Sequence, residues 1–168
     1  MTARLWKDLW SAIWLFSWLA PAIAWPSLTL ATSLAPWVDP ATGLAIGGYD
    51  PVTYFTNASP RAGRSEHEAN WRGTTWRFVN PGNRQAFVRN PDVYAPQFSG
   101  YDPYAVAHGR STRGHPAIWA IRANRLYLFY SPANRQLWLR DADAITARAE
   151  QSWRALARTL PGYSASGG

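Results

Sequence analysis

Four pairs of a short polar residue and the proline that follows it mark predicted helix starts between residues 50 and 132. Such a polar side chain can accept hydrogen bonds from the free amide groups of a helix's first turn, and proline suits the first helical position because its φ is already fixed. The pairs are Asp50-Pro51, Asn80-Pro81, Asp102-Pro103 and Ser131-Pro132. Each pair predicts the start of a helix, so the chain between them has room only for short elements.

Two stretches between these helix starts have the turn residues and β-forming side chains of hairpins. The first, HEANWRGTTWRFV at 67–79, turns at Arg72-Gly73, and the second, AIWAIRANRLYLFY at 117–130, turns at 123–125. Apolar and turn residues in this order are typical of antiparallel strand pairs. The apolar density of the second stretch predicts that its strands form the centre of the sheet and hold the core.

The helices complete an α+β pattern. Short helices are expected over 51–55, from Asn80 to before Pro91, after Pro103, and from Ser131 onward. A longer helix after Asp141 is predicted by apolar residues at spacings of three and four. We therefore predict an α+β fold, a small antiparallel sheet of hairpins with short helices and a longer C-terminal helix, preceded by an N-terminal hydrophobic helix.

Residues 9–25 form an apolar stretch behind the basic residues Arg4 and Lys7. The Ala-Ile-Ala triplet at 22–24 is typical of a signal-peptide cleavage site. The stretch is also about long enough to cross about 30 Å of hydrocarbon as a retained anchor, with tryptophans that resemble interfacial anchors. Both interpretations stay open at this point. The tryptophans are Trp6, Trp10, Trp14, Trp18 and Trp25.

Either interpretation places the bulk of the chain outside the cytoplasm, since basic residues precede the apolar stretch and none follows it until Arg61. We expect the periplasmic side of a bacterial inner membrane, with the protein anchored or secreted. The organisation is then a signal peptide or transmembrane anchor at 1–25, a Pro-, Ser- and Thr-rich linker at 26–42, a folded domain at 43–160 and a flexible tail at 161–168.

The absence of cysteine excludes disulfides, thiolate metal sites and cysteine nucleophiles. The net charge of +7 is carried almost wholly by arginine, because Lys7 is the only lysine. The arginines are spread singly from Arg61 to Arg158 rather than in a run, so we expect no nucleic-acid partner. The charge suits an anionic membrane surface or an acidic partner instead.

Four segments occur in order along the predicted domain: IGGYDPVTYF at 46–55, TWRFVNPGNRQAFVRNPDVYAPQFSGY at 75–101, VAHG at 106–109 and LYLFYS at 126–131. In this combination the chain resembles the exported YHS-domain proteins. The resemblance implies a small α+β fold and a connection with heavy metals, copper among them, because related domains are attached to metal-transporting ATPases. Family members typically have a cysteine after the Gly-Tyr pair, where this chain has Asp102. The most plausible thiolate ligand is therefore missing.

Asp102 and His108 are the first candidates for a metal site, followed by His115 and His67. Residues six apart on a helix lie about 240° apart around its axis, so Asp102 and His108 point to different sides. The competing interpretation is that Asp102 caps the helix beginning at Pro103 and that His108 bonds the last carbonyls of that helix. A nitrogen and oxygen site for copper or zinc would need the fold to bring the candidates together.

Local catalytic motifs are absent: the chain has no Gly-x-Ser-x-Gly elbow and no glycine-rich phosphate loop after a strand. We therefore predict a non-enzymatic, membrane-associated periplasmic protein without a cofactor. Its expected role is that of an accessory or assembly subunit that binds inner-membrane lipid and a membrane protein complex. The alternative is a soluble periplasmic protein that binds copper or zinc.

Overall fold

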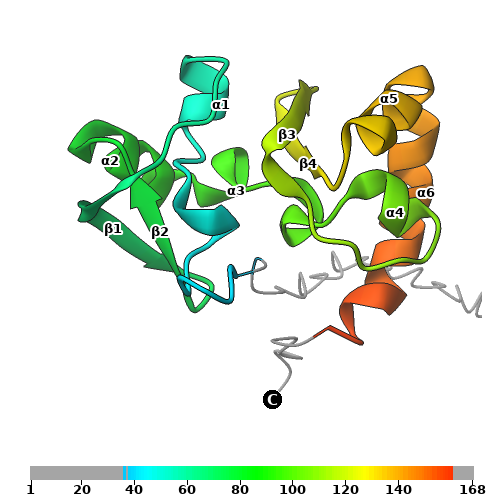
Figure 1. Cartoon of the computed structure of the whole chain (residues 1–168), viewed down its shortest axis with the longest axis horizontal. Helices are drawn as coiled ribbons and strands as arrows, with labels where there is room; N and C mark the ends of the chain where they lie inside the picture. The colour runs from blue at the N-terminus through cyan, green and yellow to red at the C-terminus, as the bar shows by residue number, and fades with distance from the viewer. Residues whose placement is uncertain (1–35, 37, 161–168) are drawn as a thin grey trace, which may run out of the picture. The chain divides into compact units, whose positions relative to one another are not determined.

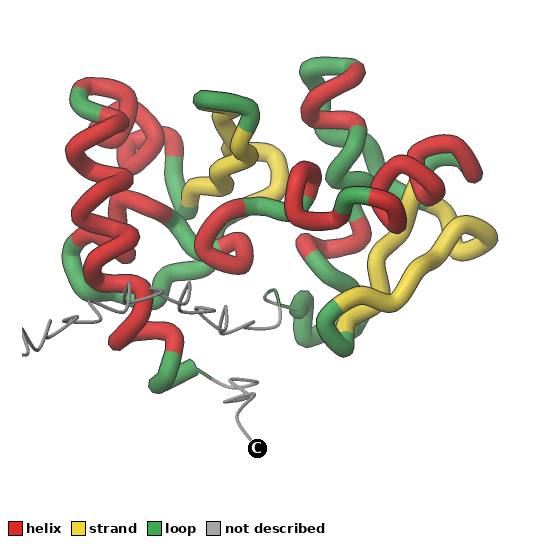
Figure 2. Tube along the Cα trace, turned by 180° about the vertical axis from the view of Figure 1, so that it is seen from behind, coloured by secondary structure: helices red, strands yellow, loops and turns green. Residues whose placement is uncertain are grey.

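The computed structural model describes residue 36 and residues 38–160 of the chain. They belong to one compact unit, which is α+β with two separate two-stranded antiparallel sheets. Figure 1 shows these two hairpins and the helices that pack beside each of them, and Figure 2 shows the same elements from behind.

Six elements make up the first half and six the second. In the first half, η1 is Ile46–Gly48, α1 is Thr53–Thr56, β1 is Arg64–Trp71, β2 is Thr74–Phe78, α2 is Pro81–Arg89 and α3 is Pro91–Tyr94. In the second half, η2 is Gln97–Gly100, α4 is Pro103–Ala107, β3 is His115–Arg122, β4 is Arg125–Phe129, α5 is Pro132–Arg140 and α6 is Ala142–Ala157. The two halves therefore have the same order of elements: a short 3-10 turn, a short helix, a hairpin and two helices.

The backbone contacts of the two halves are also the same, which makes them a structural repeat. The amide of Gly63 donates to Gly48 O over 2.9 Å, and the amide of Gly114 donates to Gly100 O over the same distance. Both hairpins carry a register irregularity near the start of their first strand, from Arg64 in β1 and from His115 in β3. We call residues 38–96 the first repeat and residues 97–160 the second repeat.

A left-handed backbone turn stands before each Gly-Tyr-Asp-Pro motif. All three residues of η1 have positive φ, with values of 42°, 64° and 77°. The last three residues of η2, from Phe98 to Gly100, have φ of 52°, 53° and 86°. Positive φ costs little free energy at glycine and more at other residues. The left-handed turn therefore costs less in the first repeat, which has two glycines there, than in the second, which has one.

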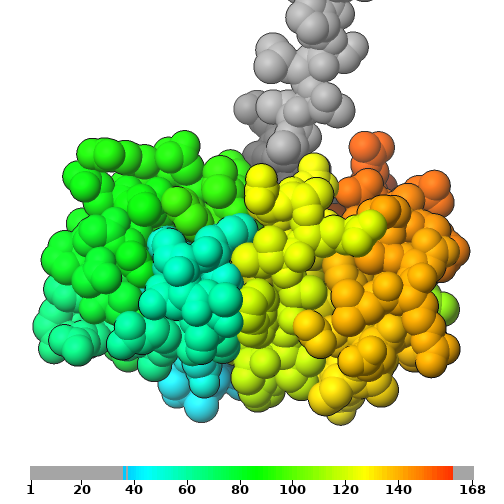
Figure 3. Space-filling model, turned by 90° about the horizontal axis from the view of Figure 1, so that it is seen from above, coloured from blue at the N-terminus to red at the C-terminus, as the bar shows by residue number. Residues whose placement is uncertain are grey.

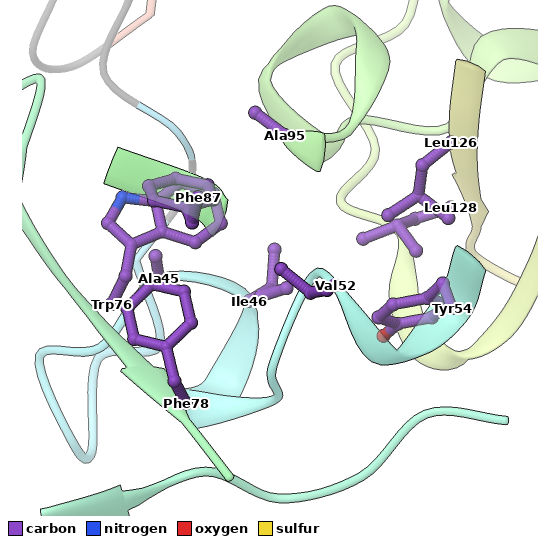
Figure 4. Packing of buried hydrophobic residues seen from close by; sticks show 10 residues of the cluster. All are labelled: Ala45, Ile46, Val52, Tyr54, Trp76, Phe78, Phe87, Ala95, Leu126 and Leu128. Atoms are coloured by element: carbon purple, nitrogen blue, oxygen red, sulfur yellow. The ribbon is translucent and has the colours of Figure 1, made fainter. Parts of the chain in front are cut away.

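The hydrophobic core joins the two repeats. Trp76, Phe78 and Phe87 of the first repeat share a cluster of buried side chains with Leu126 and Leu128 of β4, and Figure 4 shows both groups facing the residues between them. Figure 3 shows the two repeats in contact on one face of the molecule. Burying large aromatic side chains of this kind contributes about 1.5–3 kcal/mol each, so the repeats support one another.

Two further clusters lie within the second repeat. Trp138 and Phe129 are fully buried beside Ile145 of α6, and the Trp138 indole N–H donates to the Thr146 hydroxyl over 3.0 Å. Helix α4 packs along α6, where Val106 and Ala149 are fully buried. The longest helix thus covers the second hairpin and its short helix together.

The local predictions are largely confirmed. Both hairpins are present with turns at Arg72-Gly73 and Ala123-Asn124. Helices follow Asn80, Asp102 and Ser131, each of which caps its helix by accepting a hydrogen bond from a backbone amide. The longer C-terminal helix begins after Asp141.

The prediction of one sheet with the second hairpin at its centre is wrong, and so is the helix start at Pro51. Each sheet has only two strands, and η2 packs against β4 of the second sheet. Helix α1 begins at Thr53, and Val52 is its N-cap. The Asp50 carboxylate accepts a hydrogen bond from the Val52 amide, in a tight turn that precedes the helix.

The predicted signal peptide or anchor at 1–25, its tryptophans and the tail at 161–168 lie outside the described residues. So does most of the predicted linker; its described end includes an isolated β-bridge between Val38 and Ala45. Across residues 38–160, no helix has both the length and the apolar character needed to cross a membrane.

Candidate binding groove

Asp102 is completely buried and both of its carboxylate oxygens accept hydrogen bonds. One oxygen, Oδ1, accepts from the Ala105 amide over 3.1 Å, which is the predicted helix cap. The other, Oδ2, accepts from the Tyr130 amide and from the Asn134 side-chain amide, each over 2.8 Å. The side chain therefore ties α4 to the end of β4 and to α5.

Asp50 accepts a similar set of hydrogen bonds in the first repeat, although it does not cap a helix, and it is also completely buried. Its Oδ1 accepts from the Val52 amide over 2.8 Å. Its Oδ2 accepts from the Val79 amide over 2.8 Å and from the Asn83 side-chain amide over 2.7 Å. A buried carboxylate is tolerated when it accepts several hydrogen bonds, so the Asp of each Gly-Tyr-Asp-Pro motif has a structural role.

The three histidines lie on separate elements. His108 is the C-cap of α4, with Nδ1 2.7 Å from Tyr104 O, so the predicted position at the helix end is confirmed. The Nδ1 of His115 accepts from the Ala117 amide over 3.1 Å, and His67 lies within β1. Residues 38–160 contain no group of three or more His, Asp or Glu that could hold a metal ion. Metal binding stays a prediction.

A groove of about 640 Å³ lies where the α3–η2 connection, the two hairpin turns and α6 come together. We call it the inter-repeat groove, since residues of both repeats line it. The side chains that matter most in it are Trp71, Arg72, Asp92, Gln97, Phe98 and Trp153. A second hollow, lined by Arg122, Asp143 and Glu150, continues from it and shares Arg125.

The aromatic side chains of the groove are held in place from behind. Trp71 packs edge-on against the buried Phe87, with ring centroids 5.7 Å apart. Phe98 and Trp153 form another edge-on pair at 5.7 Å. Each ring is only half-buried, so part of its surface is left to the groove. Rigid, partly exposed aromatic rings give a large contact area at little cost in side-chain entropy.

The arginines of the groove are each paired with a carboxylate. Arg72 contacts Asp92 over 3.1 Å, and its guanidinium lies 4.2 Å from the centre of the Trp71 ring. Arg125 contacts Glu150 over 3.4 Å. These ion pairs are exposed, so they contribute little to stability. They do hold the guanidinium donors and the carboxylate acceptors in fixed positions at the groove.

A third ion pair, Arg122 with Asp143, joins the end of β3 to α6 over 2.6 Å beside the groove. The hydrogen bond from Arg122 lowers the pKa of the Asp143 carboxyl, and the same bond raises the pKa of Arg122. Asp143 therefore presents a carboxylate, not a neutral carboxyl group, to the second hollow.

The sequence alone did not reveal this groove. Trp71 and Arg72 stand out locally only as the end of a hairpin. Asp92 and Gln97 lie in the segment 75–101, whose pattern gives them no role, and Trp153 belongs to no recognisable motif. The groove forms because the fold brings the α3–η2 connection, the hairpin turns and α6 together, and no spacing in the chain encodes that meeting.

Comparisons with protein-family models, with curated proteins and with solved structures found no match for this chain. The function is therefore argued from the geometry.

Proposed function

We propose that this protein is a non-enzymatic accessory subunit, held on the periplasmic side of the inner membrane by its N-terminal segment, that docks onto an acidic face of a membrane protein complex. The observation that carries the proposal is an asymmetry of charge. The first repeat has six arginines and five acidic residues, whereas the second has nine arginines and four acidic residues. Net positive charge thus gathers on one repeat.

The positive charge of the second repeat is available at the surface. Arg110, Arg140, Arg148, Arg154 and Arg158 are all exposed. Among the described residues, none of these five forms an ion pair with a carboxylate. Unpaired arginines attract acidic surfaces over roughly 10 Å and contact carboxylates through paired N–H donors.

The use made of the sequence motifs supports a binding role. In both Gly-Tyr-Asp-Pro copies the carboxylate makes structural hydrogen bonds. The polar and aromatic side chains of the inter-repeat groove lie at the surface as hydrogen-bond donors, acceptors and rings. Such surfaces suit recognition by charge and shape.

The first experiment asks whether the chain stays with the membrane. Fractionation of cells and intact-mass measurement should find the full-length chain in the membrane fraction. A soluble product beginning at Trp25 would contradict the anchored subunit.

The second experiment tests the docking surface. The triple variant Arg148→Gln, Arg154→Gln and Arg158→Gln should lose co-migration with a larger complex on size-exclusion chromatography in mild detergent. A matched first-repeat variant, Arg61→Gln, Arg64→Gln and Arg89→Gln, removes the same charge and should keep it, because these arginines are exposed on the other repeat. Equal loss in both variants, or co-migration that persists in the first, contradicts docking through the second repeat.

A further inference from the structure

The inter-repeat groove gathers most of the strained backbone of the described chain. Seven residues other than glycine have positive φ between residues 38 and 160, and five of them line this groove. Two hairpin turns and the left-handed turn of η2 account for them. Backbone in sparsely populated conformations costs of order 1–3 kcal/mol each and tends to cluster where a ligand is held. The five are Arg72, Phe98, Ser99, Ala123 and Asn124.

The groove also combines flat rings with planar polar groups. Trp71, Phe98 and Trp153 supply ring surfaces, while Gln97 and Asn124 supply side-chain amides, each both a donor and an acceptor. Sugars have the matching chemistry, because the C–H face of a pyranose packs on an aromatic ring and its hydroxyl groups act as both donors and acceptors.

The charges around the groove favour a neutral ligand. Arg72 is already paired with Asp92, and Arg125 with Glu150. An anionic ligand would have to compete with these carboxylates and would meet like charge beside each arginine. Hydroxyl groups can instead donate to the carboxylates and accept from the guanidinium groups without separating the pairs.

We propose that the inter-repeat groove binds a neutral oligosaccharide of the cell envelope. The cavity of about 640 Å³ lies within the range of ligand sites and suits a ligand the size of about two or three sugar rings. Trp153 stacks on a sugar face, while the Arg72 guanidinium, which lies over the Trp71 ring, fixes the hydroxyl groups together with Asp92 and Gln97. The choice of an envelope sugar rests on the proposed periplasmic location. Arg154 of the proposed docking surface lines an adjoining hollow with Gln97 and Trp153, so the two sites are neighbours.

The test is a titration of the full-length chain in detergent with three neutral tetrasaccharides: cellotetraose, maltotetraose and the β-1,4-linked tetramer of N-acetylglucosamine. Binding is followed by tryptophan fluorescence and by saturation-transfer NMR. We expect at least one to bind saturably with a Kd below about 1 mM, the affinity of a shallow, polar site.

Two variants separate a sugar site from a merely structural groove. Asp92→Asn and Arg72→Lys should each weaken binding by about tenfold, since each removes part of the charge-assisted hydrogen bonding. The control is Glu68→Gln, which breaks the comparable ion pair to Arg77 outside the groove and should leave the Kd unchanged. Thermal unfolding midpoints of all three variants should stay close to that of the parent chain, because the pairs are exposed.

The proposal is overturned if none of the tetrasaccharides binds, or if all three variants bind like the parent. It is also overturned if inorganic phosphate displaces the sugar competitively, because the site would then be built for an anion. If an acidic peptide changes the tryptophan fluorescence and no sugar does, the groove binds a protein partner instead.

Discussion

Asp50 and Asp102 lie 52 residues apart and make equivalent hydrogen bonds in the two repeats. Each accepts with Oδ1 from a backbone amide of its own turn and with Oδ2 from the residue after a strand and from an asparagine side chain. The helix that carries that asparagine, the strand and the motif are thereby fixed to one another. The repeated Gly-Tyr-Asp-Pro sequence is thus the visible part of a repeated scaffold.

Replacing either carboxylate by its amide should destabilise the protein strongly. Asp102→Asn turns one acceptor oxygen into an NH₂ group that faces existing donors, and hydrogen bonds to a buried charge contribute about 1.5–3 kcal/mol each. We expect a loss of about 2–4 kcal/mol in the free energy of unfolding, and the same for Asp50→Asn. Urea unfolding measures both.

The control for the carboxylate prediction is Asp143→Asn, since Asp143 is 80% exposed and its ion pair with Arg122 lies at the surface. Its unfolding midpoint should move much less than those of the two buried variants. Equal shifts in all three would show that the buried hydrogen bonds do not stabilise the elements within each repeat.

Gly63 and Gly114 are equivalent positions where the backbone leaves no room for a side chain. A Cβ at Gly63 would lie 2.4 Å from the Arg77 carbonyl carbon, and one at Gly114 would lie 2.5 Å from Leu128 Cβ. Backbone and core atoms cannot move aside cheaply, so Gly63→Ala and Gly114→Ala should each cost about 2–4 kcal/mol or prevent folding.

The matched variant for these glycines is Gly109→Ala. Gly109, unlike Gly63 and Gly114, has positive φ, 71°, but nothing lies within 4 Å of a Cβ built there. This variant should cost only about 1 kcal/mol, the penalty of the backbone conformation alone. A loss at Gly63 or Gly114 no larger than at Gly109 would contradict the close approach of the strands. Circular dichroism during thermal unfolding gives the comparison.

The parts of the fold that the sequence predicted are those set by neighbours in the chain. A cap and a proline define a helix start locally, which is why the helices after Asn80 and Ser131 were found. The arrangement of the hairpins depends on which elements pack against one another, and no local pattern predicts that η2 packs against β4.

The repeat could have been found from the sequence. NPGNRQAF at 80–87 and SPANRQLW at 131–138 share the cap, the proline, the asparagine and the Arg-Gln pair at an offset of 51 residues. That offset is close to the 52 residues between the two Gly-Tyr-Asp-Pro motifs. Each arginine of these segments donates to a backbone carbonyl of the preceding hairpin, Arg84 to Glu68 O and Arg135 to Trp119 O. The binding groove has no repeated sequence pattern, because its lining residues differ between the repeats.

The second hairpin turn should be open to improvement. Ala123 and Asn124 have φ of 48° and 56°, the left-handed pair that a type I′ turn needs, and Asn-Gly is the preferred sequence for such a turn. The double variant Ala123→Asn and Asn124→Gly should raise the free energy of unfolding by about 1 kcal/mol, because it relieves backbone strain. Gly73→Ala in the first hairpin should lower it by a similar amount, and urea unfolding measures both. A destabilised double variant contradicts the turn assignment.

Stability should fall at alkaline pH because of buried tyrosine. Burial raises the pKa of Tyr54 far above its usual range, with the charges of Tyr49 and Asp50 adding to the effect, and burial also raises the pKa of Tyr127. The unfolded chain then loses these protons from about pH 10 upward while the folded chain keeps them. Fewer protons on the unfolded state mean that the free energy of unfolding falls as pH rises, by up to about 1.4 kcal/mol per pH unit for Tyr54.

Tyr54→Phe isolates the contribution of Tyr54. The variant loses the hydrogen bond from the Tyr54 hydroxyl to Pro116 O, 2.8 Å long and joining the two repeats, so it should be about 1 kcal/mol less stable than the parent chain near pH 7. Above pH 10 its stability should fall less steeply, because the unfolded variant has one ionisable hydroxyl group fewer to deprotonate. Urea unfolding midpoints measured across this range give both slopes, and parallel slopes for parent and variant would show that Tyr54 ionises as readily in the folded chain as in the unfolded one.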